Sequence, residues 1–163
     1  MNTILIIIPL FGLLALGFTF WRSAWVAKQN PGTDTMKKIA DNIAVGAMAF
    51  LRAEYKVLAI FVGCVALLLL LGGLSDPANS SPFVAVSFVV GAVCSALAGF
   101  IGMKVATKAN ARTTHAARTS LGEGLRIAFA GGSVMGLGVV GLGLLGLGLL
   151  LLIFGSAIGT GAE

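Results

Sequence analysis

The sequence has 163 residues, of which 58% are hydrophobic and only 10% charged, and its net charge is +5. A soluble domain of this length needs roughly 25% charged residues to cover its surface. The composition therefore excludes an ordinary soluble protein and indicates a membrane protein. The two cysteines, Cys64 and Cys94, both lie in apolar runs, where a buried thiol is expected rather than a disulfide or a metal site.

Four apolar segments are long enough to cross a bilayer as α-helices. We expect the spans at about 3–21, 57–74, 83–103 and 127–154, in a single membrane domain that covers residues 1–163. The first three fit a hydrocarbon core of ~30 Å at a rise of ~1.5 Å per residue. The fourth apolar run is longer, so we expect it to tilt or to include part of a loop. The predicted fold class is all-α, a polytopic membrane helical bundle with four transmembrane helices.

The basic residues are confined to two of the connections between these spans. All eleven lysines and arginines lie in 22–56 or 104–126, the two expected helical connections. Four crossings put these connections on the same side, which the positive-inside rule identifies as cytoplasmic. We therefore expect a multi-pass protein of the cell (plasma) membrane with its N-terminus outside. No cleaved signal peptide is expected, because no basic residue precedes the first span and no small-residue cleavage signal follows it.

Both basic connections have helical patterns that continue a membrane span. Thr33 or Asp34 is the candidate N-cap of the first helix, and its apolar face recurs at helical spacing in Met36, Ile39, Ile43, Ala47 and Phe50. That pattern enters the second span without a breaker, and residues 104–120 continue the third span in the same way. The protruding helices predict a cytoplasmic working end.

A basic stripe follows the third span, and it occupies about a third of a helix circumference. Its members, at steps of four, four, three and three, are Lys104, Lys108, Arg112, His115 and Arg118. The stripe is interpreted as a topology signal on a solvated face, with anionic lipid headgroups or an anionic substrate as alternatives. His115 is expected to be a surface histidine rather than a metal ligand, since it stands alone.

The glycine-rich stretches "GLGVVG" and "GLGLLG", between Gly136 and Gly146, satisfy a dinucleotide-binding pattern but lie inside an uncharged apolar run. A nucleotide fold would need a preceding strand and a later acid, so we interpret these glycines as helix-packing positions. They are spread around most of the helix. This predicts neighbours on several sides, more than four helices supply.

The sequence contains few ionisable residues that could catalyse a reaction or bind a metal. The core of each span lacks ionisable residues, and the acids on the basic side are scattered: Asp34, Asp41, Glu54 and Glu123. Magnesium–phosphate chemistry needs clustered carboxylates, whereas several of these acids have a basic residue within four positions and are expected to pair with it. We therefore assign no catalytic, cofactor-binding or metal residue to this chain.

Two long segments resemble membrane-bound, ion-translocating inorganic pyrophosphatases. The segment "GTDTMKKIADNIAVGAMAFLRAEYK" is similar to the stretch before that family's second membrane helix. The segment from Gly102 to Leu147 is similar to the exit of its third helix and to its fourth helix. A motif G-M-x-x-A-T-x-A-N-x-R-T is carried here by Gly102, Met103, Ala106, Thr107, Ala109, Asn110, Arg112 and Thr113. The run G-x-V-M-G-L is carried by Gly132, Val134, Met135, Gly136 and Leu137.

The resemblance implies the N-terminal part of a roughly sixteen-helix pump that works as a homodimer. Such a pump hydrolyses pyrophosphate at a cytoplasmic Mg²⁺ site and moves Na⁺ or H⁺ outward, and some members are stimulated by K⁺. The family's aspartate motifs and gate residues lie from the fifth helix onward, so the resemblance implies an inactive scaffold fragment here. The residues lean toward the potassium-stimulated, sodium-pumping branch. The implied partners are the lipid bilayer and the rest of the pump's helices, with no nucleic acid.

An alternative is a complete small membrane protein without enzymatic activity, either an assembly factor or a lipid-interacting protein. An assembly factor predicts a stop codon directly after Glu163. A rotor-ring subunit is disfavoured, because it would need a carboxylate at mid-membrane. A lipid-interacting protein predicts liposome affinity that falls with salt and with neutralisation of Lys108 or Arg112.

Overall fold

A computed structural model describes residues 2–75 and 81–157, and these residues form four α-helices: α1 (Asn2–Lys28), α2 (Asp34–Ser75), α3 (Phe83–Ala117) and α4 (Leu121–Ala157). Each helix is long and apolar enough to cross a membrane. The predicted class, an all-α membrane protein with four candidate transmembrane helices, is confirmed. The exact span limits stay a prediction.

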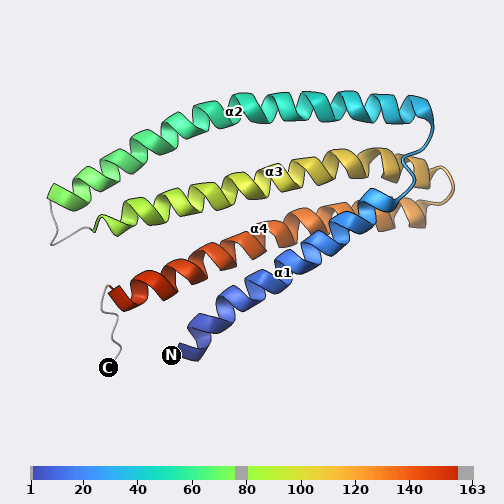
Figure 1. The fold of residues 1–163 in the computed structure, drawn as a ribbon. Helices are drawn as coiled ribbons and strands as arrows, with labels where there is room; N and C mark the ends of the chain where they lie inside the picture. The colour runs from blue at the N-terminus through green and yellow to red at the C-terminus, as the bar shows by residue number, and fades with distance from the viewer. Residues whose placement is uncertain (1, 76–80, 158–163) are drawn as a thin grey trace.

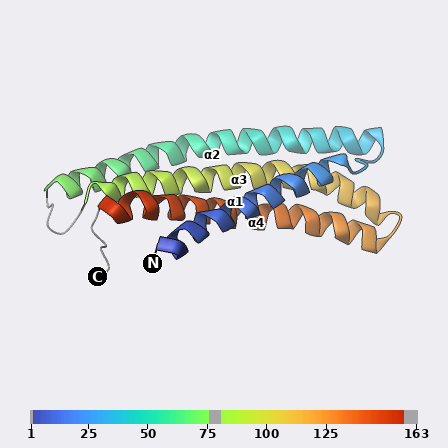
Figure 2. The ribbon, with the colours of Figure 1, turned by 60° about the horizontal axis from the view of Figure 1, so that its bottom comes forward.

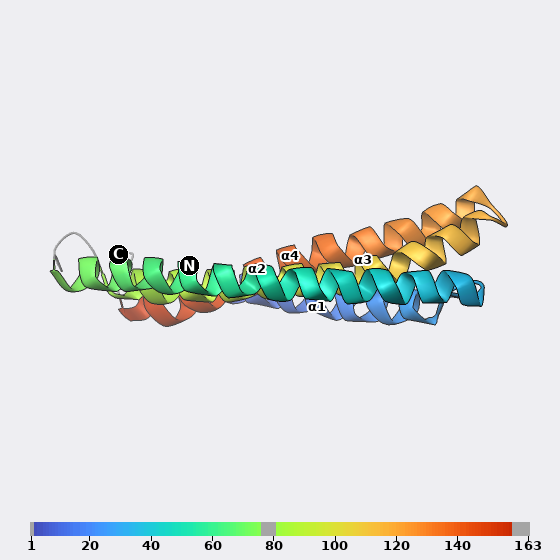
Figure 3. The same ribbon diagram turned by 90° about the horizontal axis from the view of Figure 1, so that it is seen from above.

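The helices lie in an open row rather than a closed bundle (Figure 1). The order across the row is α2, α3, α4, α1, and within the described residues α2 contacts α3 but neither α1 nor α4. Helix α1 crosses α4 obliquely (Figure 2), and seen from above the row is thin (Figure 3). The α1–α2 and α3–α4 connections lie at the same end, so the two basic connections share one end of the molecule.

Side-chain caps begin two of the helices. The backbone N–H of Met36 donates to Thr33 Oγ1 at 3.4 Å, which confirms Thr33 as the N-cap of α2, while Asp34 is its first helical residue. The backbone N–H of Glu123 donates to Ser120 Oγ at 3.1 Å at the start of α4. A serine followed by glutamate three positions later is a capping-box sequence, and this cap allows α4 to start within a tight turn after α3.

Helix α4 is the centre of the packing, and most of its buried positions recur at steps of three and four. The nine buried positions are Gly124, Ile127, Ala130, Gly131, Val134, Gly138, Gly141, Gly146 and Gly148. Helix α1 lies close against this seam. A Cβ at Gly12 would lie 2.9 Å from the Gly141 carbonyl oxygen, and one at Gly148 would lie 2.8 Å from Pro9 Cδ. Glycine lets the two backbones approach this closely, as expected for helix pairs in lipid.

The glycines of α4 divide into three sets. One set faces α1, as above. A second faces α3, where a Cβ at Gly131 would lie 2.9 Å from Ala109 Cβ and one at Gly146 would lie 2.9 Å from Cys94 Sγ. The third set, Gly132, Gly136 and Gly143, meets nothing within 4 Å in the described chain. The predicted neighbours are therefore present on two sides of α4.

Helix α2 is held to α3 by a polar contact. The Tyr55 hydroxyl donates to the Ala96 carbonyl oxygen at 2.5 Å, and Gly99 leaves room for it, since a Cβ there would lie 3.2 Å from the hydroxyl oxygen. Most of α2 is otherwise exposed, with only 6% of its most apolar window buried within the chain. A 42-residue helix with an uncovered apolar surface requires lipid or further protein around it.

We expect Gly12→Ala to lower the free energy of unfolding by about 1–3 kcal/mol, because the added methyl group would overlap the backbone of α4. Gly17→Ala is the matched control in the same helix, since a Cβ there meets nothing within 4 Å. It should be neutral or stabilising by up to ~1 kcal/mol. Unfolding in dodecyl sulfate mixed micelles, followed by circular dichroism, measures both, and equal stability of the two variants would contradict the α1–α4 seam.

Candidate functional site at the basic end

The basic stripe of α3 divides into an exposed part and a half-buried part. Lys104, Lys108 and Arg118 are exposed. Arg112 and His115 are half-buried and lie against the loop that follows α1. The interpretation of the stripe as a solvated topology signal therefore accounts for its lysines and Arg118, whereas Arg112 has a structural partner.

Arg112 fastens the end of α1 to α3. Its Nε donates to the Gln29 carbonyl oxygen at 3.1 Å and its Nη2 donates to the Ala27 carbonyl oxygen at 3.1 Å. Its Nη1 donates to the Lys108 carbonyl oxygen at 2.8 Å, within its own helix. The planar guanidinium presents several donors in a fixed arrangement, so one side chain can bridge two helices in this way.

This clamp completes the C-terminal cap of α1. A helix leaves its last carbonyl groups without partners inside the helix. Gln29 donates hydrogen bonds to two of them. Its backbone N–H donates to the Val26 carbonyl oxygen at 3.1 Å, and its side-chain Nε2 donates to the Trp25 carbonyl oxygen at 3.1 Å. Arg112 donates to the Ala27 carbonyl oxygen, and its positive charge also stabilises the negative end of the α1 dipole.

The loop after α1 depends on a glycine beside His115. Gly32 has φ +91°, and its N–H donates to Asn30 Oδ1 at 2.9 Å. A Cβ at Gly32 would lie 2.7 Å from Met36 Sδ and 3.2 Å from His115 Cβ. His115 Nδ1 is shielded from solvent and has no hydrogen-bond partner within the described residues. His115 is therefore a packing residue of this loop in the structure.

Two of the four acids at the basic end are paired, as the sequence predicts. Asp34 lies 2.9 Å from Lys37 Nζ, and Glu123 lies 3.3 Å from Arg126 Nε. The hydrogen bond from Lys37 and its charge hold the pKa of the Asp34 carboxyl below its usual value. Within residues 2–75 and 81–157 no group of three or more His, Cys, Asp or Glu residues lies close enough to hold a metal ion.

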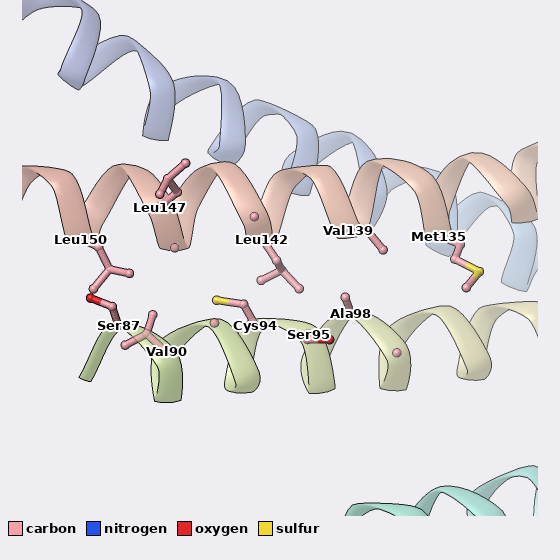
Figure 4. Close-up of a pocket in the computed structure, with 14 residues that line it drawn as sticks. Ser87, Val90, Cys94, Ser95, Ala98, Met135, Val139, Leu142, Leu147 and Leu150 are labelled. Atoms are coloured by element: carbon pink, nitrogen blue, oxygen red, sulfur yellow. The ribbon is translucent and has the colours of Figure 1, made fainter. Parts of the chain in front are cut away.

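The grooves between the helices are apolar. One groove of about 630 Å³ lies between α3 and α4. In Figure 4, Cys94 and Ala98 of α3 face Leu142 and Val139 of α4 across it, and Ser87 lies toward Leu150. Its lining carries no charged side chain, which makes it unsuitable for a phosphate or a hydrated cation. A second groove of about 320 Å³ between α2 and α3 includes Glu54 and Tyr55.

Sequence reasoning missed the partners that complete these contacts. Gln29 could have been recognised as a helix-end residue, because it directly precedes Asn-Pro-Gly. The pairing of Arg112 with α1 and of Tyr55 with α3 has no local signal, since each joins residues far apart in the chain.

These features define the class: an all-α membrane protein whose described residues form four long apolar helices. Residues 13–162 match the family described as Inorganic H⁺ pyrophosphatase, and the chain belongs to this family. The family resemblance of the sequence is thereby confirmed.

Relatives in the family carry the names of two kinds of pump. The chain is 46% identical over 95% of its length to a Clostridium tetani protein with the name of a K(+)-stimulated pyrophosphate-energized sodium pump. It is 43% identical over 92% of its length to the K(+)-stimulated pyrophosphate-energized sodium pump of Thermotoga maritima. It is 38% identical over 96% of its length to the K(+)-insensitive pyrophosphate-energized proton pump of Methanosarcina mazei. The chain covers 22%, 20% and 23% of these relatives, about a fifth of their length.

We expect Arg112→Gln to loosen the α1–α2 loop, because the carbonyl groups of Ala27 and Gln29 lose their charged donor. The expected loss of stability is about 1.5–3 kcal/mol. Hydrogen–deuterium exchange of residues 27–33 should become faster, while exchange in the middle of α4 stays unchanged. Arg118→Gln removes the same charge from an exposed position and should leave the exchange of this loop unchanged. Equal exchange in both variants would refute the clamp.

Proposed function

We propose that this chain is the N-terminal scaffold portion of a pyrophosphate-energised cation pump. The observation that carries the proposal is the family match over residues 13–162, together with coverage of about a fifth of pump-named relatives. In this proposal the whole protein couples hydrolysis of pyrophosphate to outward transport of Na⁺ or H⁺. The names of the Clostridium and Thermotoga relatives support the K⁺-stimulated sodium branch, and that of the Methanosarcina relative supports the proton branch.

The catalytic magnesium is proposed to bind outside this chain. The acids of the basic end do not fit a magnesium site, since Asp34 and Glu123 are each paired with a cation and the described residues hold no cluster of ligands. The chain is therefore assigned no step of the hydrolysis. Its proposed contribution is to hold a rigid row of helices against the rest of the pump.

The third glycine set of α4 supports contact with further helices of the pump. Gly132, Gly136 and Gly143 lie at relative angles of about 0°, 40° and 20° around the helix, so they share one face, and a Cβ at each would meet nothing within 4 Å among the described residues. Small residues on an uncovered face of a membrane helix allow another backbone to approach closely. Homodimer formation by the full-length protein stays a prediction.

A segment exchange tests the proposal. We expect the Thermotoga maritima sodium pump to keep pyrophosphate hydrolysis when residues 13–162 of this chain replace its matching segment. An unrelated four-helix segment of equal length is the control and should abolish activity. This chain purified alone should show no turnover. Magnesium-dependent turnover by the chain alone, or an inactive but folded chimera, would overturn the assignment.

The membrane orientation is proposed from the charge distribution. The basic connections are placed in the cytoplasm and the start of α1 outside. The fourth span is placed from about Gly136 onward, because Gly102 lies against Met135 and Thr19 against Gly138. The first and third predicted spans therefore end at the level of residues 135–138 of α4. Residue 136 lies roughly 13 Å along α4 from residue 127, in the direction of the bilayer centre, at a rise of ~1.5 Å per residue.

Cysteine labelling in a Cys64→Ala, Cys94→Ala background tests this orientation. Lys108→Cys should react with a membrane-impermeant maleimide in inside-out vesicles and not in intact cells. Ser75→Cys, exposed at the opposite end of α2, is the matched control and should show the reverse. Labelling of position 108 from outside intact cells would invert the proposed topology.

A further inference from the structure

Two guanidinium groups from different helices meet at one tryptophan, which lies four residues after the predicted end of the first span. Arg22 Cζ of α1 lies 5.1 Å from the centroid of the Trp25 ring, and Arg126 Cζ of α4 lies 5.0 Å from it. Arg22 Cζ also lies 5.8 Å from the Trp21 ring. Cation–π attraction stabilises both arginines at the indole, so one tryptophan contacts two like charges from different helices.

The charge of this group is incompletely neutralised. Glu123 opposes Arg126 at 3.3 Å, and both of these side chains are more than half exposed. Arg22 has no salt bridge within the described residues, and its Nε is shielded from solvent without a hydrogen-bond partner there. Leaving a charged guanidinium without an acceptor is costly, so Arg22 has unused capacity to bind an anion through its guanidinium group.

The surroundings of the arginines indicate where that ligand comes from. Phe18, Trp21 and Trp25 follow one another at three and four positions, so they share a face of α1 that descends from the basic end into the apolar span. The Phe18 and Trp21 rings lie 5.6 Å apart, and both side chains are exposed. Exposed tryptophan next to arginine at the end of an apolar segment is typical of the membrane interface.

Other basic side chains at this end lack these properties. The guanidinium group of Arg112 already donates hydrogen bonds to three backbone carbonyl groups. Lys104 is a single exposed cation whose Nζ lies 5.5 Å from the Phe100 ring. The combination of paired guanidinium groups, an unmatched buried donor and a descending aromatic face occurs at Arg22, Trp25 and Arg126.

We propose that Arg22, Trp25 and Arg126 form a binding site for the phosphate headgroup of an anionic phospholipid. The phosphate oxygens would accept hydrogen bonds from the two guanidinium groups, and an acyl chain would run along Trp21 and Phe18. Arginine suits this role because its planar donors match a phosphate. A soluble phosphate would leave the exposed aromatic face without a partner, so the site is assigned to lipid.

The test uses the two tryptophans of the chain. Trp21→Phe leaves Trp25 as the single tryptophan, which is excited selectively. This variant is reconstituted in bilayers that mix phosphatidylcholine and phosphatidylglycerol, with one of the two lipids brominated near the headgroup end of its acyl chains. Bromine quenches tryptophan on contact, so the ratio of quenching by the two brominated lipids measures the local preference of the site.

We expect Trp25 to favour phosphatidylglycerol, with a relative affinity that falls about fivefold for each arginine removed in Arg22→Gln and Arg126→Gln. Arg118→Gln removes the same charge from an exposed position on α3, away from the indole, and should keep the preference. Arg22→Lys should restore part of it, since one point charge is retained. Circular dichroism of each variant controls for loss of the fold.

Three results would overturn the site. One is equal quenching by both brominated lipids in the Trp21→Phe chain itself, a comparison that needs no arginine variant. Another is an equal loss of preference in Arg118→Gln, which would indicate general surface charge. The third is abolition of the preference by soluble pyrophosphate or inorganic phosphate at constant ionic strength, which would assign the arginines to a soluble anion.

Discussion

The close approach of helix backbones at the buried seam of α4 is the constraint on which the rest of the structure depends. Within a bilayer, lipid covers apolar side chains as well as protein does, so helices associate through close packing rather than through removal from water. The short distances at Gly12 and Gly148 show this directly, because a methyl group at either position would overlap the opposite helix. Helices α1 and α3 are neighbours mainly because both lie against α4.

The polar contacts at the basic end follow from this arrangement. Since α1 and α3 pack on the same helix, their ends converge where Trp25 lies against the core residues Val26, Ala109 and Ala130. At this point α1 ends and its carbonyl groups need donors, which Gln29 and the Arg112 side chain supply. The positive charge of Arg112 could be explained by membrane topology alone. In the structure Arg112 also donates hydrogen bonds to backbone carbonyl groups at the end of α1.

The open row has a different consequence for α2. This helix has α3 as its only helix neighbour in the described chain, and Tyr55 contributes a polar anchor between them. Its remaining apolar surface is suited to lipid or to further helices. The glycine face of α4 that carries Gly132 and Gly136 extends the same pattern, since both surfaces are compatible with a membrane environment and neither is covered by the residues that the structure describes.

Four long apolar helices, two basic connections and the Thr33 cap could be predicted from the sequence by itself, because span length, charge and capping are local properties of the chain. The family was also recognisable from ordered sequence strings. Only the tertiary structure decided that the helices form a row, that the glycines of α4 serve two neighbours, and that Arg112 and Arg126 reach α1. The physical reason is that these contacts join residues many turns apart, and periodicity within one helix cannot say which face of another helix will lie against it.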